Sequence, residues 1–408
     1  MSDSRDIPIP FAKPTLGDAE TAAIAQVIAS GWVTQGPQVA AFEDEFASFV
    51  GAPHACAVSS ATAALHLALH AIGVGRGDEV VTVSSSFIAT TNCIRYVGAV
   101  PVFVDVEPAT GNLDPARLAA AIGPRCKAIL VVHQLGLPCD MTAIEQVVAG
   151  RVPIVEDAAC AIGSEILYRG AWQRIGAPQS AVACFSFHPR KLLTTGDGGM
   201  LTTADATLAA RLRRLRQHAM SVNDRERHAS SRVIFEEYTE LGFNYRLTDI
   251  QAAMGRVQLQ RMPDMVAHRR RLAARYRAAL AQLPGVTPPY EPNWARTNWQ
   301  TYAVRLPHAA DQRRIMEAMR GDGIATRRGL MCAHREPAYE TEPWSCPGGR
   351  PHCGCPPRHC VELAASENLQ DHGIMLPMFS EMTEAQQDHV VASLARALDR
   401  EAAGAGAK

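Results

Sequence analysis

The sequence predicts an α/β fold with a mainly parallel central sheet and a smaller second domain. In the first half, short apolar segments alternate with helical segments of about ten residues, which is typical of βαβ units with helices on both faces of the sheet. The chain has 408 residues, and about 100–200 residues per domain gives two domains. We expect a large domain over residues 1–255 and a small one over residues 256–408.

The elements of the first half follow from their apolar periodicity. Helices are expected over Ala19–Ala29, Val39–Val50, Ala61–Ile72, Ile88–Val97, Leu113–Ile122 and Met141–Ala149. Short apolar strands are expected over Glu79–Val83, Val100–Val106, Ala128–Val132 and Val152–Val155. Ligands bind such sheets at the carboxyl ends of the strands, so functional residues should follow these segments.

The second half predicts fewer elements. Strands are expected over Met200–Thr203 and Ala303–Leu306, and helices over Arg313–Gly321 and Glu384–Leu398. A long helical stretch covers Ile250–Leu283, where Pro263 should break or kink the helix. The segment Glu340–Cys360, rich in Pro, Gly and Cys, predicts a loop, and Ala402–Lys408 predicts a frayed tail.

Charge and composition exclude several classes of protein. Lysine and arginine number 40 and aspartate and glutamate 41, so no basic excess favours nucleic acid. A content of 47% hydrophobic and 20% charged residues excludes a disordered chain. No apolar run approaches the ~20 residues that span a bilayer, and Asp3, Arg5 and Asp6 do not fit a signal peptide. We expect a cytoplasmic protein with neither membrane nor nucleic acid as partner.

Eleven cysteines fit that compartment, because a large chain with an odd cysteine count favours reduced thiols over a disulfide scaffold. Five of them crowd one segment: Cys332, Cys346, Cys353, Cys355 and Cys360. Four of these (Cys346, Cys353, Cys355 and Cys360), with His352 and His359, could hold zinc, which takes four sulfur or nitrogen ligands. The spacing lacks two clean CxxC pairs, so we predict no metal.

A lysine in a tight turn is the first candidate for chemistry. Lys191 follows Ser-Phe-His-Pro-Arg and precedes a glycine-rich turn into the next strand. A lysine held between strands can be desolvated, which lowers the pKa of its amine and makes it nucleophilic. An ordinary exposed loop lysine is the alternative that this segment alone leaves open.

Two further segments add an acid and a site for an anion. Asp157 follows the strand Val152–Val155, where it would face the ligand crevice or cap a helix. Ser59–Leu65 opens a helix with hydroxyls and small residues, whose free N–H groups bind an anion or are simply capped. A helix start for phosphate, an acid at a strand end and a turn-held lysine are together the parts of a pyridoxal 5′-phosphate (PLP) site.

Ordered motifs extend this pattern from about Pro8 to Leu398. They are Ser30–Pro37, Val58–Leu65, Gly77–Val80, Pro101–Val106, Glu156–Ala159, Ser186–Lys191, Gly242–Ala253 and Leu376–Phe379. With them the sequence resembles the DegT/DnrJ/EryC1/StrS family of PLP-dependent sugar aminotransferases. The resemblance implies the fold type I of aspartate aminotransferase, in which a large domain with a mostly parallel sheet precedes a smaller C-terminal α+β domain.

The resemblance also assigns the cofactor site. Lys191 matches the Schiff-base lysine, and Asp157 matches the acid that keeps the pyridine nitrogen protonated. Phe87 matches the aromatic ring that stacks on the cofactor. The phosphate cradle is matched by Ala61, Thr62 and Ser186.

Four further positions are matched less directly. Asn244 matches a residue that reaches the cofactor phosphate of the neighbouring subunit, which implies a homodimer with shared active sites. Cys160 stands near the cofactor hydroxyl, where many relatives have His or Gln, so that contact is weaker or missing. Trp32 and His334 correspond to positions on the sugar-binding side.

The activity implied is the transfer of an amino group from an amino acid, by family habit L-glutamate, to a keto sugar linked to a nucleotide. Cyclitol ketones are alternative acceptors. A lysine-retaining dehydratase or an aromatising synthase on the same scaffold stays open, whereas sugar dehydratases of this kind replace the lysine with histidine. A cofactor-binding regulator would not need to keep Lys191.

Overall fold

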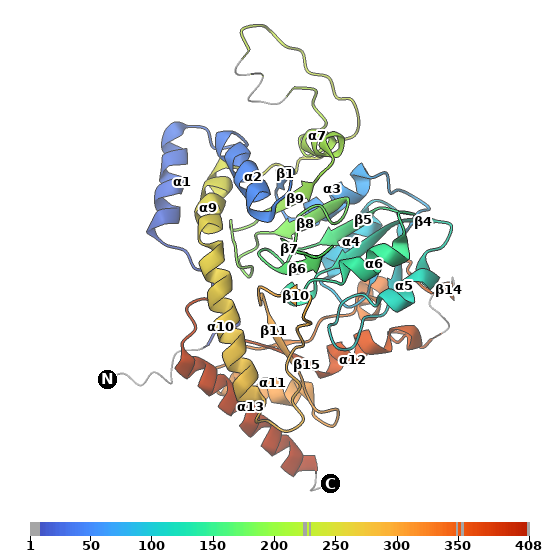
Figure 1. The fold of residues 1–408 in the computed structure, drawn as a ribbon, viewed down its shortest axis with the longest axis vertical. Helices are drawn as coiled ribbons and strands as arrows, with labels where there is room; N and C mark the ends of the chain where they lie inside the picture. The colour runs from blue at the N-terminus through green and yellow to red at the C-terminus, as the bar shows by residue number, and fades with distance from the viewer. Residues whose placement is uncertain (1–8, 223–226, 228–229, 348–349, 352–354, 406–408) are drawn as a thin grey trace.

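The computed structural model describes residues 9–222, 227, 230–347, 350–351 and 355–405, and a nine-stranded sheet forms its centre (Figure 1). In spatial order the strands are β1 (His54–Val58), β9 (Gly199–Thr203), β8 (Val182–Ser186), β5 (Ile154–Asp157), β4 (Cys126–Val132), β2 (Glu79–Val83), β3 (Val100–Val104), β13 (Ser345–Cys346) and β14 (Arg350–Pro351). In this order, every neighbouring pair from β8 across to β13 is parallel. Strand β9 is antiparallel to both β1 and β8, and β14 is antiparallel to β13. The expected mainly parallel sheet is confirmed.

Helices cover both faces of this sheet, because its strands are apolar on both sides. In β4, Ile129 and Val131 pack with one layer of helices, and Ala128 and Leu130 with the other. The first layer contains α2 (Pro37–Val50), α5 (Pro115–Ala121) and α6 (Met141–Val148), and the second contains α3 (Ala61–Ala71), α4 (Ile88–Tyr96) and α7 (Ala206–Leu215). All parallel strands therefore end at one edge, where the loops after β2, β5 and β8 meet.

The C-terminal part has its own small sheet and core. Its three strands, in the order β11 (Tyr302–Arg305), β15 (Gly373–Leu376) and β12 (Arg327–Arg328), are antiparallel. Three helices pack on them: α10 (Met262–Leu280), α11 (Gln312–Gly321) and α13 (Glu384–Ala405). Strand β13 leaves this part and pairs with β3 of the large sheet, and β14 pairs with β13. The division at residue 255, which lies within α9 (Asp249–Gln260), stays a prediction.

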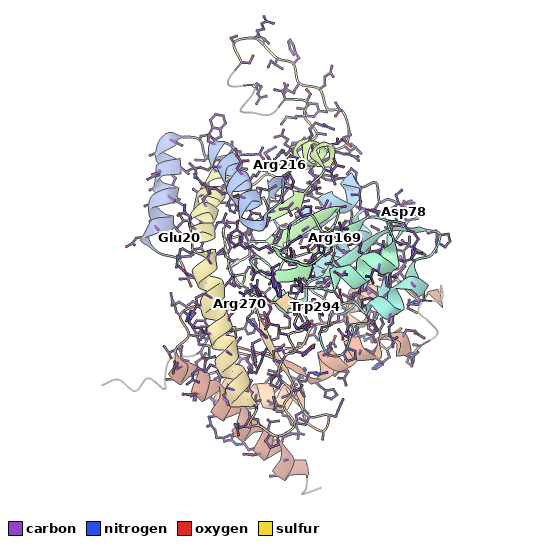
Figure 2. The ribbon with its side chains drawn as sticks, viewed as in Figure 1. Glu20, Asp78, Arg169, Arg216, Arg270 and Trp294 are labelled. Carbon is purple, nitrogen blue, oxygen red and sulfur yellow. The ribbon has the colours of Figure 1, made fainter. Side chains whose placement is uncertain are left out.

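Two helices next to the N-terminus, α1 (Asp18–Ser30) and α2, carry buried carboxylates that form ion pairs with arginines. α1 lies beside α9, where the buried carboxylate of Glu20 accepts hydrogen bonds from Gln258 and Arg261. Arg216, at the end of α7, reaches the carboxylate of Glu43 in α2 and the carbonyl oxygen of Ala57 in β1. Figure 2 labels Glu20 and Arg216 among the side chains.

Several sequence expectations need correction. The expected loop Glu340–Cys360 contains β13 and β14, because it closes the edge of the sheet beside β3. The tail expected from Ala402 is helical as far as Ala405, since α13 continues beyond Leu398, and residues 406–408 lie outside the described part. The helix break is confirmed, but α9 ends before Arg261 and Pro263 lies in the first turn of α10, where proline is tolerated.

Other elements were not expected at all. They are β1, α7, the small sheet of β10 (Ala295–Arg296), β6 (Glu165–Tyr168) and β7 (Ala171–Arg174), then α12 (Ala364–His372) and β15. Most of these segments have only two to five residues, so periodicity gives them little signal. No helix in the described residues is both long and apolar enough to cross a membrane.

Candidate active site

A buried carboxylate ends the central strand of the crevice. Asp157, the last residue of β5, is 6% exposed. The Thr90 hydroxyl donates to its Oδ2 atom at 2.7 Å, and the Ala159 N–H donates to Oδ1 at 3.1 Å. The two oxygens of a carboxylate offer about four acceptor positions, so Asp157 can still accept a hydrogen bond from a ligand.

The candidate lysine contacts a residue of the loop that follows this acid. Lys191 belongs to the loop between β8 and β9, and its Nζ atom donates to Sγ of Cys160 at 3.0 Å. Cys160 comes three residues after Asp157, and β5 and β8 are parallel neighbours with Asp157 opposite Cys184. The sheet thus brings both loops to one edge, and Lys191 is only partly exposed there.

The start of α3 packs against the end of β8 through a glycine. Ser186, the last residue of β8, pairs with Gly199 in β9. A Cβ atom on Gly199 would lie 2.6 Å from the backbone of Ser60 and 2.8 Å from the Ala61 nitrogen. Only glycine permits this approach. The Ser60 hydroxyl caps α3 by accepting from Ala63 N–H. The other first N–H groups of a helix have no partner within it, so the start of α3 offers donors to an anion.

An exposed ring lies at the next strand end. Phe87 follows β2, precedes α4 and is 62% exposed. The same loop supplies Ser86, whose hydroxyl lies 2.8 Å from that of Thr90, the donor to Asp157. The loop therefore links the exposed ring to the buried acid.

Positive charge gathers around the lysine loop. Burial lowers the pKa of His188, and the charges of Arg190, Lys191 and Arg327 lower it further, although Asp197 opposes the change. Burial also lowers the pKa of Arg327, and the nearby Arg190 adds to that effect. Like charges this close repel each other, so this side of the crevice favours an anionic ligand.

Three expected residues lie apart from this cluster. Trp32 is partly buried, and its indole N–H donates to the Gln35 carbonyl oxygen at 3.2 Å. Asn244 is exposed, next to Tyr245, whose carbonyl oxygen accepts from Ser59 N–H just before α3. The roles of both residues stay predictions.

His334 is buried rather than open to a ligand. It is 2% exposed, its Nδ1 lies 2.6 Å from the Ser84 hydroxyl, and its Nε2 lies 2.9 Å from a Glu367 carboxylate oxygen. Burial lowers the pKa of His334, although Glu367 opposes the change. With both ring nitrogens engaged inside the protein, His334 could act on a substrate only through its neighbours.

Sequence reasoning missed residues that hold the site together. Thr90 starts the helix after β2, and hydroxyls that follow strand ends are the available signal. Asn298 and Gln300 reach the loops of Cys160 and Lys191 from the C-terminal part, and no local pattern marks them.

The cysteine-rich segment carries no metal cluster among the described residues. No group of three or more histidine, cysteine or acidic side chains there could hold an ion. Cys353 and His352 lie outside the described residues, so the absence of a metal stays a prediction.

Known proteins share this architecture. The model of the DegT/DnrJ/EryC1/StrS aminotransferase family matches residues 14–395. The aminotransferase TlmJ from Streptoalloteichus hindustanus is 33% identical over 96% of this chain and 99% of its own, with a TM-score of 0.84. DesV from S. venezuelae, in complex with a ketimine intermediate, is 32% identical over 96% of this chain and 98% of its own (TM-score 0.82). DesI, solved in the presence of its TDP-sugar product, is 28% identical over 99% and 96%, with a TM-score of 0.83. These likenesses confirm the fold class expected from the sequence.

Proposed function

The chain belongs to the DegT/DnrJ/EryC1/StrS family of PLP-dependent sugar aminotransferases, and we propose that it moves an amino group from L-glutamate to a nucleotide-linked 4-keto or 3-keto sugar. One observation carries the proposal. The amine of Lys191 lies 3.0 Å from the thiol of Cys160, three residues after Asp157, at the shared edge of β5 and β8.

The residues present fit the cofactor. Asp157 has acceptor capacity for a protonated ring nitrogen, and the exposed ring of Phe87 can stack on the cofactor ring. The N–H groups of Ala61 and Thr62 at the start of α3, with the Ser186 hydroxyl, can donate to a phosphate. When bound, PLP supplies an electron sink for the carbon that loses its proton.

The side chains of the protein then hold and move protons. Lys191 is placed to take the proton from the substrate carbon that bears nitrogen and to return it on the other side of the transfer. Thr90 and the Ala159 N–H keep the carboxylate of Asp157 oriented. Cys160 occupies the place of the His or Gln expected beside the cofactor hydroxyl, and its thiol contacts Lys191 instead.

The charge of the crevice supports anionic substrates. Arg190 and Arg327 place positive charge beside the lysine loop. A glutamate carboxylate and the diphosphate of a nucleotide sugar both suit such a site. The TDP-sugar product of the related DesI supports the nucleotide linkage.

We further propose a homodimer in which Asn244 reaches the partner's cofactor phosphate. The chain before Asn244 carries apolar side chains in water: Val233 is 85%, Phe235 89% and Leu241 88% exposed. Figure 1 shows this segment projecting beyond α7, away from the rest of the molecule. Apolar surface of this kind marks an interface.

The buried thiols of Cys56 and Cys93 suit a reducing, cytoplasmic setting.

The test follows nitrogen from donor to acceptor. Purified protein with PLP and nitrogen-15-labelled glutamate is mixed with TDP-, UDP- and GDP-linked keto sugars, free keto sugars and cyclitol ketones. We expect 2-oxoglutarate release and label in a nucleotide-linked amino sugar, and neither with Lys191→Ala. If the label appears only in a cyclitol or a free sugar, the acceptor belongs to that class and is not a nucleotide-linked sugar. Dehydrated or aromatic product without nitrogen transfer would refute the proposal.

A further inference from the structure

One side-chain amide binds the backbone on both sides of the candidate lysine. The carboxamide nitrogen of Gln300 donates to the Arg190 carbonyl oxygen at 2.6 Å. Its oxygen accepts the Leu192 N–H at 3.0 Å. These groups belong to the two peptide bonds that flank Lys191. Gln300 is 6% exposed, so water cannot easily replace either bond.

The lysine loop depends on such outside contacts, because residues 189–198 form no helix or strand. On the N-terminal side, the N–H groups of Arg190 and Lys191 are bound by His188. On the C-terminal side, Thr194 and Thr195 return to the Phe187 carbonyl oxygen. Between these anchors, Gln300 fixes the turn at the residue that carries the amine.

The same segment also holds the loop of Cys160. Asn298 is fully buried, and its Nδ2 atom donates to the carbonyl oxygens of Cys160 and Ile162, both at 2.8 Å. Its Oδ1 atom accepts the Gln300 N–H at 2.8 Å. The Asn298 side chain is thus bonded to the backbone of Gln300, and the two side-chain amides bind the two loops whose side chains meet at 3.0 Å.

Asn298 and Gln300 are themselves held by contacts within the C-terminal part. The buried guanidinium of Arg269 in α10 contacts the carbonyl oxygens of Trp299, Gln300 and Met378 at 3.4, 3.3 and 2.8 Å. Trp299, between the two amides, has a φ of 53°, a conformation that non-glycine residues adopt only where their surroundings impose it. The position of Gln300 is therefore set by packing outside the crevice.

We propose that Gln300 is a positioning residue that fixes both peptide bonds of Lys191, and so sets where the amine lies relative to Cys160 and Asp157. Asn298 fixes the opposing loop in the same way. The proposal rests on the proposed role of Lys191. A lysine has four rotatable side-chain bonds, so the location of its amine depends on how firmly its backbone is held.

The test measures capture of cofactor rather than turnover. Cofactor-free protein is mixed with PLP, treated with borohydride at set times and digested, and the modified lysine is located by peptide mass. The assignment is simple because the chain has only four lysines, Lys13, Lys127, Lys191 and Lys408. Capture rates are recorded across a range of pH, since the rate profile reports the state of the amine.

Two variants remove the contacts in different ways. Gln300→Leu keeps the volume and loses both hydrogen bonds. Gln300→Glu keeps the acceptor for Leu192 but sets a carboxylate oxygen against the Arg190 carbonyl. The matched control is Gln387→Leu, because Gln387 is also fully buried and donates to the Leu272 carbonyl oxygen at 2.9 Å, within the C-terminal part.

We expect both Gln300 variants to capture PLP at Lys191 at least about tenfold more slowly than wild type. Small misplacements of a reacting group slow a reaction by this factor or more. Gln387→Leu should keep the wild-type rate and pH profile even where its melting temperature falls. Wild-type rates and profiles in a folded Gln300→Leu or Gln300→Glu would overturn the proposal. No capture at Lys191 in the wild type would instead refute the proposed function itself.

Discussion

The amine of Lys191 lies 3.0 Å from the thiol of Cys160, although 31 residues separate them in the chain. The contact arises because β5 and β8 are parallel neighbours, so the loops after both strands leave the sheet at one edge. Asp157 lies three residues before Cys160 in the same segment of the chain. This contact thus joins the candidate nucleophile to the segment that bears the candidate acid.

Lys191→Ala should abolish turnover and the borohydride-reducible attachment of PLP. The variant loses the amine, while the other contacts for the cofactor remain, so PLP can still bind non-covalently. The measurement is intact mass after borohydride treatment, with Lys127→Ala as control, since Lys127 is exposed in β4. A stable adduct in Lys191→Ala would show that another lysine carries the chemistry.

Asp157→Asn should bind PLP but lose turnover by at least about tenfold, or ~1.4 kcal/mol of transition-state stabilisation. An amide has no charge to hold a proton on the ring nitrogen. Single-turnover rates with glutamate measure the effect. The control is Asp114→Asn, because Asp114 caps α5 by accepting from Ala116 N–H. If both variants keep normal rates and lose only stability, Asp157 is no more than a cap.

Asn244→Ala should weaken PLP affinity by about tenfold, since a hydrogen bond to a charged group contributes roughly 1.5–3 kcal/mol. Equilibrium dialysis measures the affinity, and sedimentation shows whether dilution to monomer releases the cofactor. Asn293→Ala, at another exposed asparagine, is the control. A monomer that is fully loaded and active would contradict the shared site.

Glu43→Gln should destabilise the fold by about 3–5 kcal/mol, because it leaves the guanidinium of Arg216 buried without its countercharge. Replacing both partners, as Glu43→Leu with Arg216→Met, should cost less than the single change. Denaturant unfolding measures both. Glu317→Gln, in an exposed pair with Arg313, should change little. A single variant as stable as wild type would show that the pair contributes nothing.

Stability should fall as the solution is acidified below about pH 6.5. Burial lowers the pKa values of His66, His188, His268 and His334 below the ordinary 6.5, so the unfolded chain binds more protons there. Their contribution is complete above pH 6.5 and is lost as pH falls through the folded values. Melting temperatures at about pH 7.5 and about pH 5.5 test this across the range where histidine titrates.

The variant His334→Gln isolates one of these groups. It should show a smaller drop in melting temperature between the two pH values than wild type, because its side chain does not titrate. The exposed His308 gives the control His308→Gln. An unchanged drop in His334→Gln would assign the acid sensitivity to the other histidines or to carboxylates.

The sequence by itself predicted most strands of the large sheet, including β2, β3, β4, β5 and β9, and the family to which the chain belongs. The strand Glu79–Val83 has the expected bounds, because a short apolar run between turn residues is a local property. The glycine-rich turn after Lys191 and the acid after an apolar strand are also local, so neighbouring residues alone are enough to place both side chains at strand ends.

Only the tertiary structure decided which groups hold those side chains. The donor to Asp157 is Thr90, 67 residues away, and the groups that bind the backbone of Lys191 come from Gln300, more than a hundred residues later. The tertiary structure also buries His334, whose ring nitrogens contact Ser84 and Glu367. Such contacts depend on how whole elements pack, whereas periodicity and turn chemistry report only on neighbours along the chain.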